Sequence, residues 1–501
     1  MLKKLIAGLC LLSISICTFS VPVYAGEKQL NQNIRGFDTS SLIKTDLSYW
    51  VWGNNQSVPT QITALTDVIQ SFPDQLVMKK DGSVWYWENT SSGVQVQQMN
   101  GLSEIVGVAS SWNGSLTYNR TGKVQYLPKS EGRFTPGQAD YAELREIDHV
   151  VDINSYYDQN GVFRWLFVCD DGRLFQSNEG LDAITPVESL RSIKEVEDNI
   201  LLQADGTVLQ LKNSRNDSDE RTNTTGSGEL QYAQVEGLKG IQRIASRSGS
   251  YLAIDQQGRV WFWGVTYTGY SDGTTQHQHP KAIQLTGLKE KAKEVFIVER
   301  TLVIFAEGGN VYGTSIDQLS SLASSNAFKL IANEIQDIKA STRHMIMMKY
   351  GGSLWGYGVN KNAQLGHGDY EFMYDQPVSV QKPVSVVFNG EVIQLNNGVM
   401  IQNGQAFIPL RSIFEKIGAE IGWDVDTKIT TLEQKKAEPA VNIRVDFRSG
   451  EVTKNGETVT LKNKPFVAQS TAYLPLRFIS EALGAKVDWN QEAGKITITT
   501  K

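Results

Sequence analysis

Cysteine and histidine are scarce in this chain of 501 residues, which has three cysteines and five histidines. Cys10 and Cys17 lie in an apolar N-terminal segment, which leaves Cys169 alone in the rest of the chain. Without that segment no intrachain disulfide can form, so stability must come from packing. Cys169 follows an apolar, strand-like run and is expected to be a buried, inert thiol.

An excess of positive charge is also missing, since 48 lysines and arginines face 54 aspartates and glutamates, for a net charge of −6. Proteins that bind a phosphate backbone concentrate positive charge, whereas the basic patches here are short and scattered. Nucleic acid is therefore not an expected partner. Hydrophobic residues make up 40% of the chain, which is enough for packed cores and excludes a wholly disordered chain.

One long apolar run is present, at the N-terminus. It follows two lysines and ends near Phe19, and Val23–Ala25 places small residues where a signal peptidase cuts. Residues 1–25 are expected to be a secretory signal peptide cleaved before Gly26, which would make the protein secreted or held at the cell surface. No other stretch is long enough to span a bilayer, so no membrane insertion is expected after cleavage.

A glycine-centred pair of apolar runs recurs along the chain, with aromatic or aliphatic residues at alternate positions of the second run. Clear copies are Leu76–Trp87, Leu252–Gly264 and Met345–Gly358, and degenerate copies turn at Gly122, Gly172, Gly206 and Gly309. The turn glycines from Gly82 to Gly352 are on average 45 residues apart. A glycine turn between alternating runs is typical of a β-hairpin, and the spacing leaves room for two more short strands. Four strands per unit indicate propeller blades.

The predicted fold class is mainly β, with a β-propeller over residues 47–370 after a lead-in at 26–46. Tyr49–Gly53 matches the outer half of a hairpin whose first half is missing. A ring can close when strands from both ends share one blade, so we predict seven blades, with six or eight as alternatives. The recurring tryptophans are expected to pack blades rather than to form a sugar platform. They are Trp50, Trp52, Trp85, Trp87, Trp261, Trp263 and Trp355.

The last copy contains Gly358–Gly368, which fits the pattern Gly-x-Asn-x-x-x-Gln-Leu-Gly-x-Gly. Together with strands such as Val260–Gly264, it resembles regulator-of-chromosome-condensation repeats over about residues 47–370. The other copies lack the Gln-Leu-Gly part, so their assignment depends on spacing. The resemblance implies a propeller scaffold. It does not imply the nucleotide exchange and chromatin binding of the eukaryotic namesake, because a signal peptide, a negative net charge and the lack of a basic tail oppose them.

Composition changes at Pro377–Pro383, within the expected linker 371–383, and residues 384–501 contain a duplication with an offset of 66 residues. The aligned segments are Phe407–Asp424 with Tyr473–Asn490, and Asn389–Glu391 with Asn455–Glu457. Each copy is predicted to form a hairpin around Asn-Gly, a strand, a short helix that starts at proline and ends at glycine, and two closing strands. The propeller is thus followed by a small duplicated α+β domain.

Arg411 and Arg477 fall in the first turn of these helices, where the helix dipole disfavours cations. Glu415 and Glu481 lie four residues further on, so an ion pair is predicted in each copy, with a ligand-facing arginine as the alternative.

The repeated Pro-Leu-Arg, Glu, Gly-Ala and Trp pattern closely resembles the copper amine oxidase N-terminal-like domain, also called the stalk domain. The resemblance implies a non-catalytic accessory module with a spacing or tethering role at the cell envelope. Oxidase chemistry would require a cofactor tyrosine and three copper histidines. The nearest string, Asp369–Glu371, has the wrong first residue.

His277 and His279 are the only histidine pair with metal-ligand spacing, and two such imidazoles could share a copper or zinc ion. They lie in Gly273–Pro280, which is interpreted as a solvated loop between blades, without a carboxylate or cysteine to complete a site. No catalytic residue, metal or cofactor is therefore assigned. His344 precedes a blade strand and is expected to be structural.

The favoured function is that of an exported, non-enzymatic binding or scaffold protein. Its propeller face would recognise an extracellular or cell-wall protein or glycan, and the duplicated domain would space or tether it. The alternative is a hydrolase or lyase that uses carboxylates on an extracellular polysaccharide; two carboxylates about 5 to 10 Å apart in a cleft would favour it. Copper-dependent oxidation is a third hypothesis.

Overall fold

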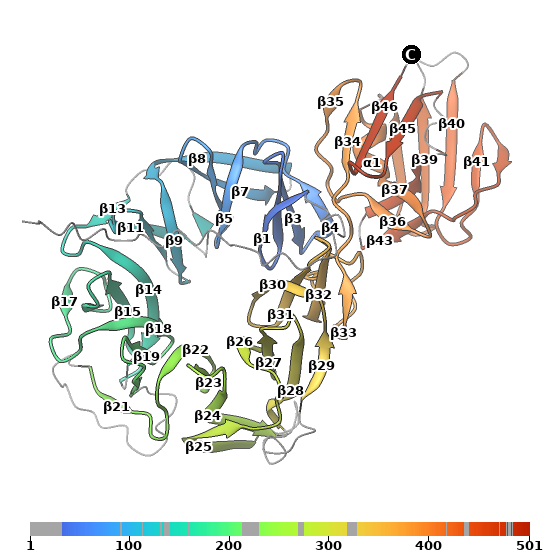
Figure 1. The fold of residues 1–501 in the computed structure, drawn as a ribbon. Helices are drawn as coiled ribbons and strands as arrows, with labels where there is room; N and C mark the ends of the chain where they lie inside the picture. Colours follow the sequence, from blue (N-terminus) through green and yellow to red (C-terminus); the bar gives the residue numbers. More distant parts are fainter. Residues whose placement is uncertain are drawn as a thin grey trace, which may run out of the picture.

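The computed structural model describes residues 33–90, 93–112, 114–130, 133–134, 141–158, 160–212, 230–268, 275–317, 328–416, 418–434, 440–469, 471–476, 478, 482 and 484–500. The expected signal peptide lies outside the described residues. Strands predominate and form a large ring with a smaller domain beside it (Figure 1). No helix within the described residues combines the length and apolar character that crossing a membrane requires.

The ring contains eight antiparallel sheets, each made of strands consecutive in the chain, with the first strand nearest the axis and the last at the rim (Figure 1). The first four sheets comprise β1 (Ile34–Phe37), β2 (Ser41–Lys44), β3 (Tyr49–Gly53), β4 (Gln56–Gln61); β5 (Val68–Phe72), β6 (Leu76–Lys79), β7 (Ser83–Thr90), β8 (Gly93–Ser103); β9 (Ile105–Ser110), β10 (Gly114–Asn119), β11 (Val124–Ser130), β12 (Arg133–Phe134), β13 (Ala142–Leu144); and β14 (Val150–Tyr157), β15 (Phe163–Cys169), β16 (Leu174–Ser177), β17 (Ile184–Pro186).

The other four sheets comprise β18 (Ile193–Glu197), β19 (Ile200–Gln203), β20 (Val208–Leu211), β21 (Tyr232–Gln234); β22 (Ile241–Arg247), β23 (Ser250–Asp255), β24 (Val260–Thr268), β25 (Thr275–Leu285); β26 (Ala292–Val298), β27 (Thr301–Ala306), β28 (Val311–Ser315), β29 (Lys329–Ala332); and β30 (Ile335–Ala340), β31 (His344–Lys349), β32 (Leu354–Val359), β33 (Met373–Ser379). Separate apolar clusters fill the spaces between neighbouring sheets.

The blade count is eight within the described residues, which is one of the two alternatives to the predicted seven. The expected lead-in supplies β1 and β2, so the hairpin of Tyr49–Gly53 has its first half and no blade is shared between the chain ends. The first half of this hairpin is not evident in the sequence because the turn has no glycine; Leu47 takes the left-handed conformation there, with φ of 64°. The last blade also extends to Ser379, into the expected linker.

A hydrogen bond from a backbone N–H at the start of one blade to the hairpin turn of the preceding blade recurs along the chain. The Gly122 carbonyl accepts from the Val150 N–H at 3.2 Å, and Gly172, Gly206, Gly258 and Gly309 repeat this contact with the next inner strand. Gly122 has φ of +74°, and a Cβ atom there would lie 2.3 Å from the His149 backbone. Glycine is therefore required by both the turn and the close approach of the neighbouring blade.

The last and first blades close the ring through side chains and the loop that carries the family motif. The Trp52 Nε1 donates to the Gln364 carbonyl at 2.8 Å, and the Asn54 N–H donates to the Asn362 carbonyl at 2.6 Å. His344 is buried, and its Nε2 lies 3.0 Å from the Thr39 carbonyl oxygen. Trp50, Leu42 and Leu354 belong to one apolar cluster across this seam.

The C-terminal domain contains three sheets built from both copies of the duplication. Its elements are β34 (Ser385–Phe388), β35 (Glu391–Val392), β36 (Met400–Gln402), β37 (Gln405–Pro409), α1 (Leu410–Phe414), β38 (Glu420–Asp424), β39 (Ile429–Gln434), β40 (Val441–Asp446), β41 (Val452–Lys454), β42 (Glu457–Val459), β43 (Phe466–Ala468), β44 (Thr471–Pro475), β45 (Lys486–Asn490) and β46 (Lys495–Thr499). Strands β37 and β44 pair symmetrically, with Phe407 opposite Pro475 and Pro409 opposite Tyr473. The copies share one apolar core and thus form a single domain.

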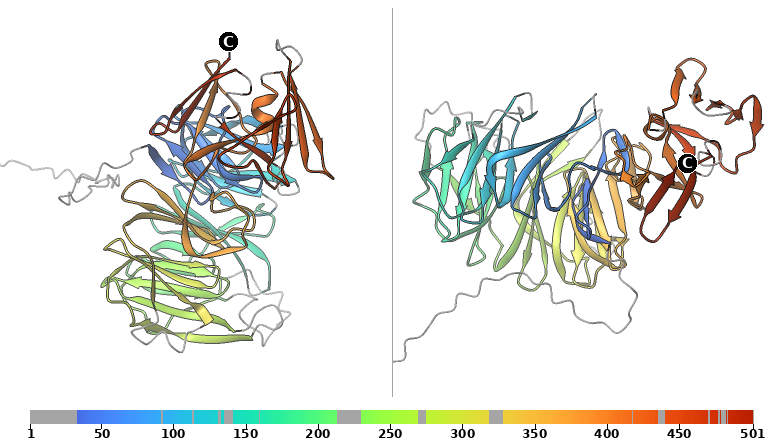
Figure 2. Two further views of the ribbon diagram at one scale, coloured as in Figure 1. Left: turned by 90° about the vertical axis from the view of Figure 1, so that its right-hand side faces the viewer. Right: turned by 90° about the horizontal axis from the view of Figure 1, so that it is seen from above.

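The C-terminal domain lies beside the blue, N-terminal part of the ring (Figure 2). It contacts β4, the outermost strand of the first blade. The Ser57 N–H donates to Asn397 Oδ1 at 3.0 Å, and the Gln394 Nε2 donates to the Gln61 carbonyl at 2.8 Å. Val58 is fully buried in a cluster with Met400, Phe407 and Tyr473 of the C-terminal domain. An exposed edge strand would be prone to pair with other chains, and this contact removes that edge.

We expect Trp52→Ala to destabilise the ring by about 3 to 5 kcal/mol, because it removes a buried indole and its hydrogen bond at the closing seam. Urea unfolding measures the change in the free energy of unfolding. Trp112→Ala, at a side chain that is 75% exposed, is the matched control and should change little. Equal effects of the two substitutions would contradict the role of Trp52 in closure.

Gly398→Ala should loosen the contact between the propeller and the C-terminal domain, because the new Cβ would lie 2.3 Å from the Pro59 carbonyl oxygen. The cost is about 1 to 3 kcal/mol, as for other overpacked sites. Calorimetry should show the two domains unfolding at more separated temperatures. Gly351→Ala, where a Cβ meets nothing within 4 Å, should leave the thermogram unchanged.

Candidate functional site

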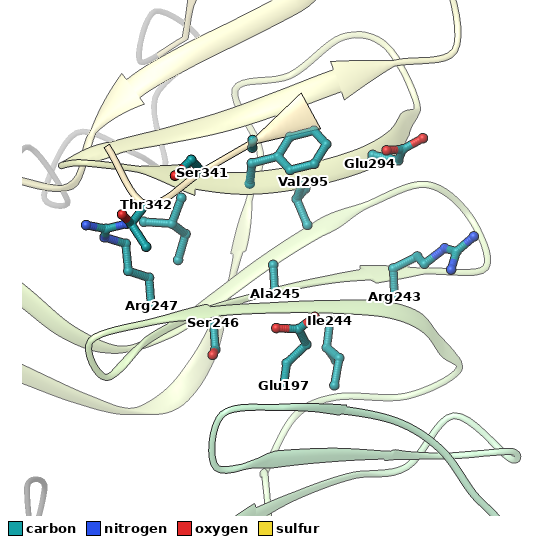
Figure 3. A pocket seen from close by; sticks show the side chains of 13 residues that line it. Glu197, Arg243, Ile244, Ala245, Ser246, Arg247, Glu294, Val295, Ser341 and Thr342 are labelled. Atoms are coloured by element: carbon teal, nitrogen blue, oxygen red, sulfur yellow. The ribbon is translucent and has the colours of Figure 1, made fainter. Parts of the chain in front are cut away.

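The main candidate site is a pocket of about 600 Å³ at the axis of the propeller, hereafter the channel pocket. Its walls come from the inner strands of four consecutive blades, β18, β22, β26 and β30 with the residues that follow β30 (Figure 3). In that view Arg247 and Thr342 lie at one end, Arg243 and Glu294 lie at the other, and Glu197 projects from β18 between them. Convergence of residues from several blades is the usual way in which a propeller builds a binding site.

A bulge recurs near the start of these inner strands, and in two of them it precedes a charged residue of the lining, Arg243 or Glu294. The register shifts between Ile193 and Glu195, between Ile241 and Arg243, and between Ala292 and Glu294. A bulge re-aims the side chains that follow it, so the apolar residue before each bulge packs between blades and the charged residue two positions later takes a new direction.

Arg247 is the most unusual group of the channel pocket. Its Nη2 lies 4.0 Å from Glu299 Oε2, but Glu299 also binds Arg343 through two hydrogen bonds of 2.8 and 3.0 Å. The buried Arg247 Nη1 has no hydrogen-bond partner. Burial lowers the pKa of Arg247, while Glu299 opposes that shift. A buried guanidinium donor without a partner is costly. The rest of the Arg247 side chain is 20% exposed and lines the pocket, where its positive charge favours an anionic group.

Glu197 faces the same pocket with a raised pKa. Burial, and then the nearby carboxylates Glu195, Asp152 and Asp198, raise the pKa of Glu197 to about 7. Burial also raises the pKa of Asp152 and of Glu195, but each accepts a backbone hydrogen bond from the next blade, which lowers it in part. These two therefore link blades, whereas Glu197 has no such partner among the described residues.

His277 and His279 do not lie in a loop, as the sequence interpretation had them, but on the rim strand β25. The strand pairs with β24, which places His277 opposite Thr266 and His279 opposite Gly264. His279 Nε2 lies 2.9 Å from Thr266 Oγ1, and His277 Nε2 lies 3.0 Å from Thr268 Oγ1. Within the described residues no group of three or more histidine, cysteine, aspartate or glutamate side chains is arranged to hold a metal ion.

The other singled-out residues are structural in the described part of the chain. Cys169 is 1% exposed, and burial raises its pKa to about 11. Trp50, Trp52, Trp87 and Trp263 are buried as expected for blade packing. His344 and Asp369 both bind within the last blade and its seam, and Asp369 accepts from the Tyr374 hydroxyl at 2.6 Å.

The predicted ion pair between arginine and glutamate is present in the first copy of the duplication, with 3.7 Å between Arg411 Nε and Glu415 Oε1. Both side chains are more than half exposed, at 65% and 62%, so the pair adds little stability. The second pair, Arg477 with Glu481, lies outside the described residues.

Residues 387–498 match the family model described as the copper amine oxidase N-terminal domain. This chain is 28% identical over 154 residues to the ultraviolet-B receptor UVR8 of Arabidopsis thaliana, and the alignment covers 28% of this chain and 34% of that protein. The chain thus spans about a third of the length of this curated relative. These matches confirm both family resemblances of the sequence.

Among solved structures, Prp20p of Saccharomyces cerevisiae is similar with a TM-score of 0.41 and 13% identity, covering 64% of this chain and 91% of that one. Human WBSCR16 is similar with a TM-score of 0.39 and 16% identity, covering 66% of this chain and 86% of that one.

Glu197→Gln should remove a pH dependence of stability. The folded protein holds the proton of Glu197 up to a pH of about 7, above the ordinary 4.5, so the free energy of unfolding falls as pH rises between these values. The variant should lack this loss, and its free energy of unfolding at pH 8 should exceed that of the parent by roughly 1 to 3 kcal/mol. Urea unfolding from pH 5 to 8 measures it.

Glu146→Gln, at an exposed turn, is the control and should leave the slope unchanged. If the parent and Glu197→Gln lose stability in parallel as pH rises, the Glu197 carboxyl is not the cause of the pH dependence.

Proposed function

We propose that this chain is an exported, non-enzymatic binding protein whose channel pocket holds an anionic group of an extracellular protein or glycan. The Arg247 guanidinium is the observation that carries this proposal, because its carboxylate partner Glu299 lies 4.0 Å away and engages Arg343 more closely, at 2.8 Å. A carboxylate or phosphate beside the exposed part of the Arg247 side chain would neutralise a charge that Glu299 only shares. The Ser246 and Ser341 side chains of the lining offer hydroxyls beside it, and Ile244 and Val295 offer apolar contacts.

The C-terminal domain acts in this proposal as an arm that spaces or tethers the propeller at the cell envelope. Its contact with β4 combines paired hydrogen bonds with a shared apolar cluster, which supports a fixed arrangement of the two domains rather than a loose one. A rigid arm would hold the ring, and the pocket on its axis, at a constant distance from the attachment point.

A second candidate function has one observation in its favour. A carboxyl whose pKa is about 7 suits a general acid, so Glu197 could serve a polysaccharide hydrolase or lyase. A second carboxylate, that of Glu294, lines the same pocket. The neighbouring arginines favour binding of an anion instead, since their charge would hold a substrate carboxylate rather than activate water.

Binding is tested by calorimetric titration of the full chain with two anionic probes, a galacturonate hexamer and a glutamate-rich peptide, against neutral galactose and glutamine counterparts. At least one anionic probe should bind, and Arg247→Met should lower its affinity tenfold or more because the charged donor is lost. Arg120→Met, at an exposed turn, is the control.

Unchanged affinity in Arg247→Met, or no binding of either anionic probe, would overturn the proposal. New reducing ends released from the hexamer by the parent, and not by Glu197→Gln, would establish the hydrolase instead.

A further inference from the structure

The C-terminal domain has a groove of its own, hereafter the edge groove, with a volume of about 700 Å³. It lies between β38 and β43, each of which is the outermost strand of its sheet. Among the described residues, its lining includes the cations Arg411, Lys428 and Arg448 and no carboxylate. The charge of the lining therefore selects for an anionic occupant.

Apolar side chains are unusually exposed in the edge groove. Trp423 is 40% exposed and Val467 is 38% exposed, and the Trp423 ring lies 5.8 Å from that of Phe447 between centroids. The duplication supplies a comparison, because Trp489 occupies the equivalent position of the second copy and packs against the core. The same residue type thus serves the core in one copy and lines an open groove in the other.

The counterpart of the β43 edge in the first copy, on β36, has a partner within the chain. There the side-chain amide of Gln381 pairs with the edge strand β36: the Ile401 N–H donates to Gln381 Oε1 at 3.2 Å, and Gln381 Nε2 donates to the Ile401 carbonyl at 3.4 Å. An amide is the group that a further β-strand would present. The chain itself thus satisfies this edge with a peptide-like partner.

The offset of 66 residues places Val467 where Ile401 stands and Phe447 where Gln381 stands. The registers agree, since Ile401 lies opposite Ala406 in one hairpin and Val467 opposite Ala472 in the other. The N–H and C=O of Val467 therefore face the edge groove, and a phenylalanine ring offers them no amide. A peptide backbone in the groove would supply it.

The backbone of Lys428 is also unusual. Its φ angle is 59°, a left-handed conformation that is strained for lysine. Its counterpart in the second copy is Gly494, with φ of 61°. Glycine would relieve the strain at this position, yet the first copy carries a cation that lines the edge groove. Arg448 is held beside it by a hydrogen bond from its Nη2 to the Asp426 carbonyl.

We propose that the edge groove binds an extended acidic peptide segment of a partner protein, which adds a strand to β43 at Val467. Carboxylates of the segment would meet Lys428, Arg448 and Arg411, whose exposed pair with Glu415 is weak enough to exchange. Apolar side chains at alternate positions would pack on Trp423 and Phe466. This interaction does not depend on the ligand of the channel pocket.

Fluorescence anisotropy of a labelled peptide, Thr-Glu-Val-Asp-Val-Glu, with the full chain tests the proposal. Lys428→Gly should weaken binding at least tenfold while raising the melting temperature, because the charge is lost and the strain is relieved; a folding defect would do the opposite. Lys486→Gln, an exposed charge outside the groove, should leave the affinity unchanged. Unchanged binding in Lys428→Gly would overturn the proposal.

Strand addition is tested separately by Val467→Pro, which removes the N–H from an edge strand that can carry proline, with Val467→Thr as its backbone-competent control. Loss of peptide binding only in the proline variant supports the proposal. If a galacturonate hexamer binds instead, with the same dependence on Lys428 and none on the proline, the groove holds an anionic glycan and the peptide is excluded. Arg247→Met should not alter peptide binding. A failure of the channel-pocket proposal can therefore be told apart from a failure of the edge-groove proposal.

Discussion

The propeller depends on one repeated hydrogen bond, from the N–H at the start of an inner strand to the carbonyl of the preceding blade's hairpin turn. The bond brings two backbones so close that the turn residue must have a positive φ angle, and in most blades it must also lack a side chain. It fixes the spacing of the blades, and the apolar side chains between them then fill the remaining space. The first blade keeps the same bond with Leu47 in the glycine's place, since the Val68 N–H donates to the Leu47 carbonyl.

The seam between the last and first blades is built differently, because no consecutive chain connects them. The motif loop supplies what a shared blade would otherwise give: Asn360 is fully buried, accepts from the Leu365 N–H, and donates to Asp369, which fixes the loop against Trp52. The first blade is then held on both sides, by this loop and by the C-terminal domain on β4. The two contacts make the first blade the joint between ring and arm.

Both candidate sites arise where a regular pattern is locally broken. In the channel pocket, bulges precede Arg243 and Glu294, and Glu299 engages Arg343 more closely than Arg247, whose buried Nη1 has no partner among the described residues. In the edge groove, two copies of one sequence pattern differ at a few positions, and an amide that covers one strand edge is replaced by a ring at the other. In each case the unusual feature is a polar group whose partner is missing, which is a reason to look for a ligand.

The sequence alone determined the blade repeat, the duplication and the burial of Cys169 and most recurring tryptophans, because glycine turns and alternating apolar residues act over short distances. It missed the first blade, since Leu47 takes a conformation that glycine usually signals, and it took His277 and His279 for a loop because a polar rim strand lacks apolar alternation. Only the tertiary structure revealed the channel pocket and the edge groove. Each depends on which side chains from distant strands meet and which are left unpaired, and spacing along the chain carries no record of that.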